Sequence, residues 1–363
     1  MVKRAPIETY CEKKISTLQK NAIGMIDYVD ISSVDNIKKK IISFQTMNAK
    51  DAPSRAKQLL KKYDILVSTV RPNLNAVAVV ESETDNLMVG STGYCVLRCK
   101  ENMDFRYLFN FCQSQYFIDD MSSQATGASY PAVSTAIVRS SLIPNYPVDE
   151  QRRIASELDK ITDLIDKRKE QLEKLDALVK ARFVELFGDY RINEKGFDCK
   201  KGSELFQFSS GKFLPEVKRL DEGVPVYGGN GIAWYTSECL VDYPTIIIGR
   251  VGAQCGNIHA VTTPVWITDN AIYIKEQKTK AYTLEFLTEL MRMMDFYQYA
   301  DFSGQPKITQ KPLETLDYIM PPIELQNQFD AFVEQTDKSK LEVQKSLEKL
   351  ELLKNALMQK YFG

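Results

Sequence analysis

The amino-acid sequence predicts an α+β fold: two mixed α/β domains separated by two long antiparallel coiled-coil helices, with a pseudo-twofold internal repeat. Three observations support this prediction. A segment of 42 residues recurs 175 positions further along the chain, both copies carry a heptad pattern of apolar residues, and strand-like segments precede each copy. The length of 363 residues leaves room for about two domains.

The first domain is predicted over residues 1–146. Residues 64–70 and 76–80 are rich in β-branched side chains, which is typical of strands. Residues 105–121 have the apolar spacing of an amphipathic helix. Residues 1–75 hold 14 Lys and Arg against 7 Asp and Glu, which suits contact with phosphates and equally suits a solvated face.

The first long helix is predicted over residues 147–188. Its apolar residues follow alternating four- and three-residue steps that are interrupted only at Arg168 and Arg182, and a 3.5-residue period over about five heptads is typical of a coiled-coil seam. Pro147 suits a helix start and Gly188 a helix end. The seam consists of Ile154, Leu158, Ile161, Ile165, Leu172, Leu175, Val179 and Leu186.

The second domain is predicted over residues 189–321. Residues 245–248 and 265–274 are typical of strands, and residues 284–299 of a helix. Residues 227–231 form a glycine-rich segment that suits a tight turn. The run Ile246-Ile247-Ile248-Gly249 resembles Ile65-Leu66-Val67-Ser68 of the first domain, so the duplication extends upstream of the helices.

The second long helix, predicted over residues 322–363, repeats the first. Ten of the 42 aligned positions are identical, where unrelated segments would share about two or three. The heptad register is kept by Phe329, Val333, Val343, Leu347, Leu350 and Leu357. The identities are Pro147 with Pro322, Gln151 with Gln326, residues 172–175 with 347–350, Leu178 with Leu353, Ala181 with Ala356, Phe187 with Phe362 and Gly188 with Gly363. Two paired helices of about 60 Å, at about 1.5 Å per residue, would form a rigid spacer.

The sequence carries no recognisable catalytic or cofactor-binding motif. It has neither a G-x-G-x-x-G segment after a strand nor a Walker A motif. The only Pro-Pro, in Met320-Pro321-Pro322-Ile323, lacks the polar and aromatic ends of a methyltransferase loop and suits a helix start. His259 is the only histidine, so histidine-based acid–base chemistry is disfavoured, and we interpret it as structural or as a polar contact.

The composition is that of a folded protein, with a net charge of −1 and 26% charged residues. Seven cysteines without a CxxC pair predict neither a zinc ribbon nor a disulfide framework. No apolar run approaches the roughly 20 residues that span a bilayer, and the N-terminus lacks the apolar core of a signal peptide. We therefore expect a cytoplasmic protein with no metal or cofactor of its own.

Several motifs, in their order along the chain, resemble the specificity subunits of type I restriction–modification enzymes. Residues 147–154 and 322–329 look like the family's P-P-x-x-E-Q-x-x-I helix entry, with Tyr146 and Leu325 as departures. The resemblance covers essentially the whole chain. The other matching segments are residues 28–35 (YVDISSVD), 304–309 (GQPKIT) and 226–231 (VYGGNG).

The resemblance implies a DNA sequence-specificity subunit that is not catalytic by itself. Each domain would be a target-recognition domain for one half of a bipartite double-stranded DNA target. The helices would set the spacing and dock two methyltransferase subunits, which carry S-adenosylmethionine and modify adenine at N6. A restriction subunit that uses ATP and Mg²⁺ can join such a complex.

Polar and basic residues in strand-end loops are the candidates for DNA contact. Arg71 and Arg250 each follow the matched strand, where an arginine fork can grip guanine or phosphate. About half of the candidates have an alternative interpretation as solvated loop residues or turn formers. The candidates in the first domain are Lys38, Lys39, Lys40, Lys50, Ser68, Thr69, Arg71, Asn73, Asn75, Ser129 and Tyr130. Those in the second domain are Lys212, Tyr227, Asn230, Tyr235, Arg250, Gln254, Asn257, Gln305 and Lys307.

Two other functions stay open on the sequence alone. A self-sufficient DNA methyltransferase or nuclease would bind S-adenosylmethionine as a purified chain. A coiled-coil protein adaptor would show no sequence-specific retention of DNA.

Overall fold

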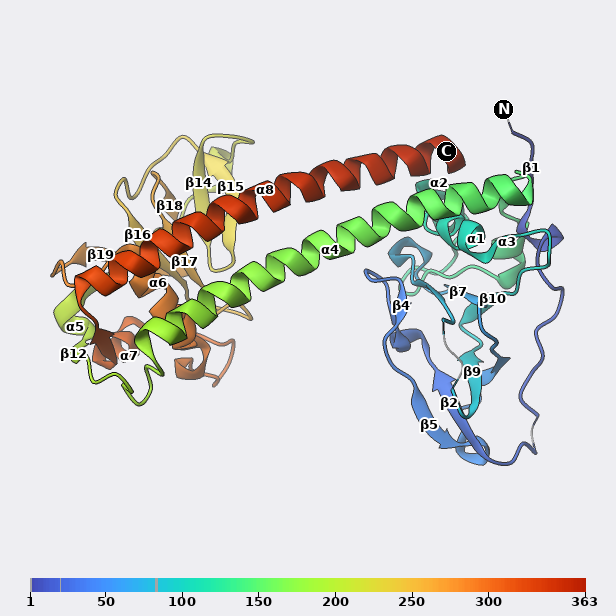
Figure 1. Ribbon diagram of the computed structural model, residues 1–363, viewed down its shortest axis with the longest axis horizontal. Coiled ribbons are helices and arrows are strands. Elements are labelled where there is room, and N and C mark those ends of the chain that lie inside the picture. Colours follow the sequence, from blue (N-terminus) through green and yellow to red (C-terminus); the bar gives the residue numbers. More distant parts are fainter. Residues whose placement is uncertain (1, 20, 82–83) are drawn as a thin grey trace. The chain divides into compact units, whose positions relative to one another are not determined.

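The computed structural model describes residues 2–19, 21–81 and 84–363, and the chain divides into two compact units. Unit 1 comprises Met1–Lys169 together with Lys345–Gly363, and unit 2 comprises Glu170–Gln344. Unit 1 is discontinuous in sequence because the C-terminal helix returns to it (Figure 1). Each unit has its own sheets and its own buried core.

Two long helices pass through both units, as the heptad pattern predicts. Helix α4 spans Val148–Phe187 and helix α8 spans Ile323–Phe362, with 40 residues each. Prolines precede both helices because a proline has no backbone N–H to leave unsatisfied in the first turn. Gly188 follows α4 in the left-handed region (φ +71°), and its N–H donates to the carbonyl of Val184 at 2.8 Å.

The two helices pair in antiparallel fashion within each unit. In unit 1, the hydroxyl of Tyr361 near the end of α8 donates to Glu157 near the start of α4 at 2.7 Å. In unit 2, Lys340 of α8 forms an ion pair with Asp176 of α4 at 2.8 Å. The apolar seam faces inward, and its buried members are Ile154, Leu158, Ile161, Ile165, Val179, Phe329, Val343 and Leu347.

Unit 1 is a mixed α/β unit. Among its described residues, a four-stranded sheet has the order β5-β2-β9-β6, a three-stranded sheet has the order β10-β7-β8, and β1-β11 and β3-β4 form pairs. The strands are β1 (Arg4–Pro6), β2 (Met25–Val29), β3 (Val34–Asp35), β4 (Lys40–Ile41), β5 (Gln45–Asn48), β6 (Ala56–Leu59), β7 (Ile65–Ser68), β8 (Val77–Val79), β9 (Leu87–Ser91), β10 (Tyr94–Leu97) and β11 (Leu142–Pro144). Short 3-10 turns are η1 (Ile7–Thr9), η2 (Ile31–Ser33), η3 (Ala49–Asp51) and η4 (Pro72–Leu74).

The single helix predicted over residues 105–121 is two helices, α1 (Phe105–Phe111) and α2 (Gln115–Ser123). The break occurs because Ser114 caps α2, its hydroxyl accepting from the N–H of Phe117 at 3.2 Å. A third helix, α3 (Thr135–Ser140), precedes β11.

Unit 2 repeats this organisation around a different set of strands. Among its described residues, a four-stranded sheet has the order β13-β19-β16-β17, a three-stranded sheet has the order β15-β14-β18, and β12 pairs with β20. The strands are β12 (Asp198–Lys201), β13 (Phe206–Ser210), β14 (Val224–Gly228), β15 (Gly231–Thr236), β16 (Thr245–Gly249), β17 (Ile258–Val261), β18 (Trp266–Ile267), β19 (Ala271–Gln277) and β20 (Asp317–Met320). The helices and 3-10 turns are α5 (Gly202–Leu205), η5 (Glu216–Lys218), α6 (Leu284–Met293), η6 (Phe296–Tyr299) and α7 (Gln310–Thr315).

Two predicted elements of unit 2 are also divided. The helix predicted over residues 284–299 becomes α6 and η6, because Asp295 between them takes a left-handed backbone conformation (φ 46°). The strand segment predicted over residues 265–274 becomes β18 and β19, with a turn between them. The predicted turn at residues 227–231 is present as the β14–β15 hairpin.

The end of one long helix packs into the core of each unit. In unit 1, Phe362 of α8 packs against Tyr107 and Phe111 of α1, with ring centroids 5.3 and 5.8 Å apart. In unit 2, the equivalent Phe187 of α4 packs against Phe286 of α6 and Phe329 of α8, at 4.8 and 5.6 Å. Both phenylalanines are fully buried, so the repeat conserves the same closure of the core in the two units.

A buried glutamine fixes the start of each long helix. The side chain of Gln151 accepts from the N–H of Asp104 at 2.9 Å and donates to the carbonyl of Tyr146 at 2.8 Å. Gln326 accepts from the N–H of Thr283 at 2.9 Å and donates to the carbonyl of Pro321 at 2.8 Å. Asp104 and Thr283 are the N-caps of α1 and α6, so this contact, which we call the glutamine clamp, sets the angle between the domain and its helix.

No helix of the described residues is both long and apolar enough to cross a membrane.

Candidate nucleic-acid interface

The loop that follows the central strand of each unit is built in the same way twice. In unit 1, β7 leads to Val70, which forms a bridge with Ala132, and the next N–H, that of Arg71, donates to the carbonyl of Pro131 at 2.7 Å. In unit 2, β16 leads to Val251, which forms a bridge with Lys307, and the N–H of Gly252 donates to the carbonyl of Pro306 at 2.9 Å. Arg71 and Gly252 therefore occupy equivalent positions.

This pair of positions requires a left-handed backbone. The φ angle is 50° at Arg71 and 81° at Gly252. Glycine adopts this region freely, whereas a residue with a Cβ atom loses about 1–2 kcal/mol there. Unit 1 thus holds an arginine where the backbone favours glycine, and such an exception points to a role for the side chain.

The Arg71 side chain lies against an exposed tyrosine. Its guanidinium carbon is 4.8 Å from the ring centroid of Tyr130, which is a cation–π contact. Tyr130 is 69% exposed, and Ser129 beside it is exposed as well. Arg71 is exposed, and among the described residues its guanidinium has no hydrogen bond or ion pair.

The segment that carries Arg71 is fixed at its other end by Asn75. The Asn75 amide is buried and donates to the carbonyl of Cys112 at 2.8 Å. The ammonium of Lys39 donates to the Asn75 side-chain oxygen at 2.8 Å, and burial, with a smaller effect of the nearby Lys354, lowers the pKa of Lys39 to about 8. Lys39 and Asn75 therefore hold the loop, and the exposed Asn73 lies between the fixed ends.

The remaining basic candidates of unit 1 are more open. Lys38, in the turn between β3 and β4, and Lys40, the first residue of β4, are exposed on either side of Lys39, and Lys50 is exposed in η3. Ser68 and Thr69 are buried instead, and their hydroxyls donate to the carbonyls of Val70 and Gly93 at 3.0 and 2.9 Å. Ser68 and Thr69 thus stabilise the strand-end backbone.

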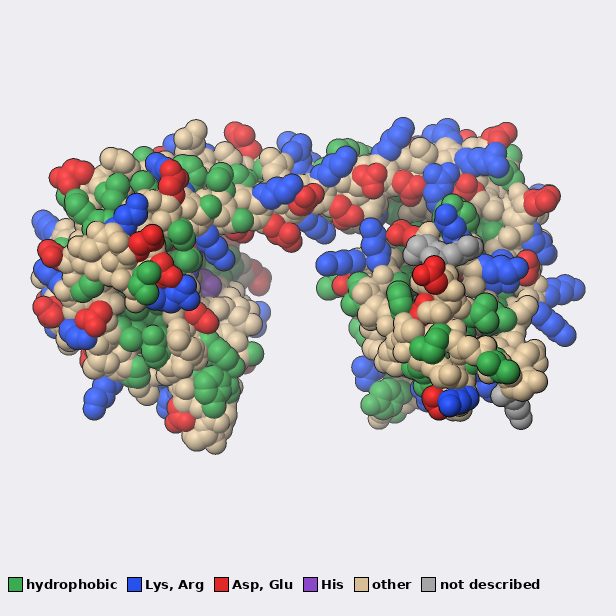
Figure 2. Space-filling model, turned by 60° about the horizontal axis from the view of Figure 1, so that its bottom comes forward, with side chains coloured by type: hydrophobic (Ala, Val, Ile, Leu, Met, Phe, Trp, Pro, Cys, Tyr) green, Lys and Arg blue, Asp and Glu red, His purple; other side chains and the backbone are tan. Residues whose placement is uncertain are grey.

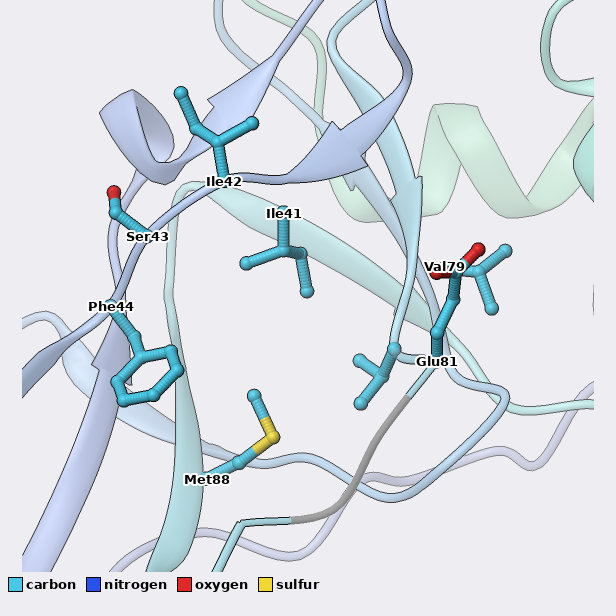
Figure 3. A pocket seen from close by; sticks show the side chains of 8 residues that line it. Ile41, Ile42, Ser43, Phe44, Val79, Glu81 and Met88 are labelled. Atoms are coloured by element: carbon cyan, nitrogen blue, oxygen red, sulfur yellow. The ribbon is translucent and has the colours of Figure 1, made fainter.

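An apolar pocket of about 150 Å³ lies beside the lysine turn. Figure 3 shows Ile41, Phe44 and Met88 around the hollow, while Ile42 points away from it. Its polar lining residues are Ser43 and Glu81. Among the described residues that line this pocket no side chain is cationic and Glu81 is acidic, so the pocket does not suit a phosphate.

In unit 2, the predicted DNA-contact residues near Arg250 form hydrogen bonds within the unit. The Arg250 guanidinium is half-buried and donates to the carbonyl of Asp269 at 3.5 Å. The amide of Asn257 donates to the side chain of Gln254 at 2.6 Å. Arg250 lies two residues before Gly252, so it is the counterpart of Thr69 and not of Arg71. Asn257 also lines a pocket of about 230 Å³ with Arg292.

Gln305 and Lys307, on the segment that pairs with the Gly252 loop, are exposed. A Cβ atom added at Gly252 would lie 3.3 Å from the amide nitrogen of Gln305, so the Gln305 side chain covers the glycine. Gln305 is the counterpart of Tyr130, since both precede the matched proline. At this loop, unit 1 therefore presents Arg71 over Tyr130, whereas unit 2 presents Gln305 over Gly252.

The last group of candidates lies on the β14–β15 hairpin of unit 2. Asn230 is exposed at the tip, whereas Tyr227 and Tyr235 are half-buried. The ring of Tyr227 is 5.9 Å from that of His259, whose pKa is lowered by burial. Lys212 is exposed, and its carbonyl accepts from the indole N–H of Trp266 at 2.9 Å.

Charged side chains of both signs alternate on the long helices (Figure 2). Within the described part of the chain, no group of three or more His, Cys, Asp or Glu side chains is placed to hold a metal ion. Cys11, Cys95 and Cys112 are buried in unit 1, where burial raises the pKa of the Cys112 thiol.

Sequence reasoning missed the equivalence of Arg71 and Gly252. The signal was present, because aligning Ile65-Leu66-Val67-Ser68 with Ile246-Ile247-Ile248-Gly249 also aligns residue 71 with residue 252. The repeat in the sequence identified Gln151 and Gln326 as identical residues, but it did not predict the hydrogen bonds of the glutamine clamp.

Comparison with known proteins places this architecture in a family. The family described as "Type I restriction modification DNA specificity domain" matches residues 7–176 and 194–352. The chain is 24% identical over 249 residues to the type I restriction enzyme EcoprrI specificity subunit of Escherichia coli, which is 64% of this chain and 61% of that protein. It is 29% identical over 211 residues to the HindI specificity subunit of Haemophilus influenzae, which is 54% of this chain and 45% of that protein. The matches thus span about half of each relative's length.

Solved structures share the fold. One comes from work on complex assembly and conformational transition of the type I R-M system, with a TM-score of 0.61, 23% identity, and coverage of 99% of this chain and 97% of that one. Another is the type I restriction–modification S subunit from M. genitalium, with a TM-score of 0.64, 19% identity, and coverage of 99% and 96%. The fold class predicted from the sequence is therefore confirmed.

Proposed function

The chain belongs to the family of type I restriction modification DNA specificity domains, and on that premise we propose that it reads a bipartite duplex DNA target, one half with each unit. The observation that carries the proposal is the contrast at the strand-end loops. Two units with the same core closure and the same glutamine clamp present different side chains on equivalent loops, Arg71 with Tyr130 in unit 1 and Gln305 over Gly252 in unit 2.

Different side chains at equivalent loops suit an asymmetric target. The major groove offers a distinct pattern of donors and acceptors for each of the four base pairs. An arginine fork and a glutamine amide select different patterns, so the two halves of the target would differ in sequence. Exposed lysines such as Lys38, Lys40 and Lys307 would contact phosphates and fix the orientation on the duplex.

The long helices would set the spacing between half-sites and dock the catalytic partners. Leu178 and Leu353 are equivalent in the repeat, and they are 48% and 49% exposed. Exposed leucines at equivalent positions suit two copies of one apolar partner surface. We assign these sites to two methyltransferase subunits that carry S-adenosylmethionine and modify adenine N6. A restriction subunit using ATP and Mg²⁺ is a further partner of this proposal.

The docking sites can be tested by counting subunits. Leu178→Asp or Leu353→Asp should each reduce the bound methyltransferase from two copies to one, and the double variant should bind none. Lys180→Asp, an exposed charge reversal two residues from Leu178 and therefore on a different face of α4, is the control and should leave two copies bound. Equal occupancy in all variants, measured by native mass spectrometry, would place the docking surface elsewhere.

The function itself is tested by mapping N6-methyladenine in DNA from cells with and without this gene. The proposal expects one motif made of two short specific segments and a nonspecific gap, methylated only when the gene is present. A methylation pattern that does not change, or an uninterrupted motif, would refute the proposal.

A further inference from the structure

Arg71 combines three properties that a merely solvated arginine does not need. Its backbone is left-handed, where its counterpart in unit 2 is glycine. Its loop is fixed at one end by the N–H to Pro131 hydrogen bond and at the other by Asn75. Its guanidinium lies over the Tyr130 ring and has no polar partner among the described residues.

The stacked arrangement controls how the guanidinium donates. A guanidinium held over an aromatic ring loses freedom to rotate, so its N–H groups leave the contact in a fixed fork. A fork of two parallel donors matches the O6 and N7 acceptors that guanine presents in the major groove. A lysine can donate to the same two acceptors, but its ammonium is a flexible point charge and lacks the fixed fork.

We propose that Arg71, oriented by Tyr130, reads one guanine in the half-site bound by unit 1. This inference rests on the proposed function and assigns one base of the target. The same position in unit 2 offers no such fork, because Gly252 has no side chain and Gln305 covers it. Residues 71 and 252 are thus a point at which the two units differ in base specificity.

A phosphate contact would not require this construction. The exposed Lys38, Lys40 and Lys50 already supply positive charge in unit 1 without a strained backbone. A phosphate accepts from any nearby cation, so neither the ring nor the fixed loop would matter. The strained position and the aromatic support are explained by a base contact.

The test uses the full chain with its methyltransferase partners and a duplex selected from a randomised DNA pool. Each guanine of the selected half-site is replaced in turn by 7-deazaguanine, which lacks the N7 acceptor, or by inosine, which keeps O6 and N7. For the wild type, one 7-deazaguanine position should weaken binding roughly 5- to 150-fold, and inosine at that position should not.

Three variants give the matched comparison. Arg71→Gly installs the residue of unit 2 and removes the contacts to both O6 and N7, so it should bind the selected duplex at least as weakly as the wild type binds the 7-deazaguanine duplex, with no further loss on that duplex. Arg71→Lys keeps the charge without the fork, so it should bind the selected duplex more weakly than the wild type and more tightly than Arg71→Gly. Arg55→Ala removes a different exposed charge from unit 1, and any loss should be equal on all duplexes.

The outcomes separate this inference from the proposed function. If the wild type selects no bipartite duplex, the proposed function fails. If the wild type selects one but Arg71→Gly stays sensitive to the same 7-deazaguanine, the inference about Arg71 is wrong. An equal loss by Arg71→Gly on specific and random duplexes, with a salt slope smaller by about 1, would make Arg71 a phosphate contact and overturn the inference.

Discussion

The two units differ where they face solvent and agree where they hold the long helices. Gln151 and Gln326 make the same hydrogen bonds, and Phe362 and Phe187 close the same kind of core. At the strand-end loops, by contrast, an arginine in unit 1 replaces the glycine of unit 2. The two copies therefore share the glutamine clamp and the core closure, and they differ in the strand-end loops that these parts position. The predictions below test each side of this comparison.

The largest effect is expected from the core phenylalanines. Phe362→Ala and Phe187→Ala should each destabilise the unit that holds the side chain by about 3–5 kcal/mol, because a fully buried ring leaves a cavity. Hydrogen exchange should show faster opening of β7, β8 and β10 in Phe362→Ala, and of β16, β17 and β19 in Phe187→Ala.

Gln359→Ala, an exposed substitution near Phe362, is the control for the end of α8 and should leave exchange unchanged. If Phe362→Ala opened unit 2 more than unit 1, the assignment of the C-terminal helix end to the N-terminal unit would be incorrect.

The glutamine clamp should give the next largest effect. Gln151→Ala and Gln326→Ala each leave a backbone N–H and a backbone carbonyl without their partner. We expect the free energy of unfolding to fall by about 2–3 kcal/mol in each unit. Denaturant unfolding measures this loss of stability. Gln328→Ala, which replaces an exposed neighbour of Gln326, is the control and should change the stability little. Losses that differ strongly between the two units would show that the clamp is not equivalent in the repeat.

A smaller effect should appear at the left-handed position, and it should differ between the units. Gly252→Ala should lose about 1 kcal/mol, since a Cβ atom is disfavoured at this φ and meets Gln305. Arg71→Gly should stay within about 0.5 kcal/mol, because relief of strain offsets the extra freedom of the unfolded glycine. Thermal unfolding of both variants decides the point, and a large loss in Arg71→Gly would mean that the arginine is structural.

The last prediction concerns Lys39 and pH. Burial and the nearby Lys354 lower the pKa of Lys39 from 10.5 to about 8 in the folded chain. Between those pH values the unfolded chain binds more protons, so folding becomes more favourable as pH rises. The stability of the wild type relative to Lys39→Met should therefore increase from pH 8 to 10.5. A flat difference would show that the pKa of Lys39 is not lowered.

The sequence was most informative where a pattern repeats over many residues. The heptad spacing predicted α4 and α8, and Pro147 and Gly188 predicted where α4 begins and ends. Short elements were less predictable, because a single side-chain cap decides them: the hydroxyl of Ser114 starts α2 and so divides a helix that the apolar spacing alone would continue.

The candidate interface was predictable as a region but not residue by residue. Lys39 and Asn75 are polar loop residues in the sequence, yet tertiary contacts engage them with each other. Arg250 follows the matched strand as Arg71 does, but the hydrogen bonds with Pro131 and Pro306 shift the equivalence by two residues. No local pattern encodes these partners, since they come from segments far away in the sequence.

The most direct test of the proposal is to shorten both long helices together. Deleting residues 168–174 and 342–348 removes one heptad from each helix, which is about 10 Å at 1.5 Å per residue and about three base pairs of duplex. Mapping of N6-methyladenine should then show the same two half-site sequences with a shorter gap. An unchanged gap, or altered half-site sequences, would contradict the proposal that the helices set the distance between two independent reading units.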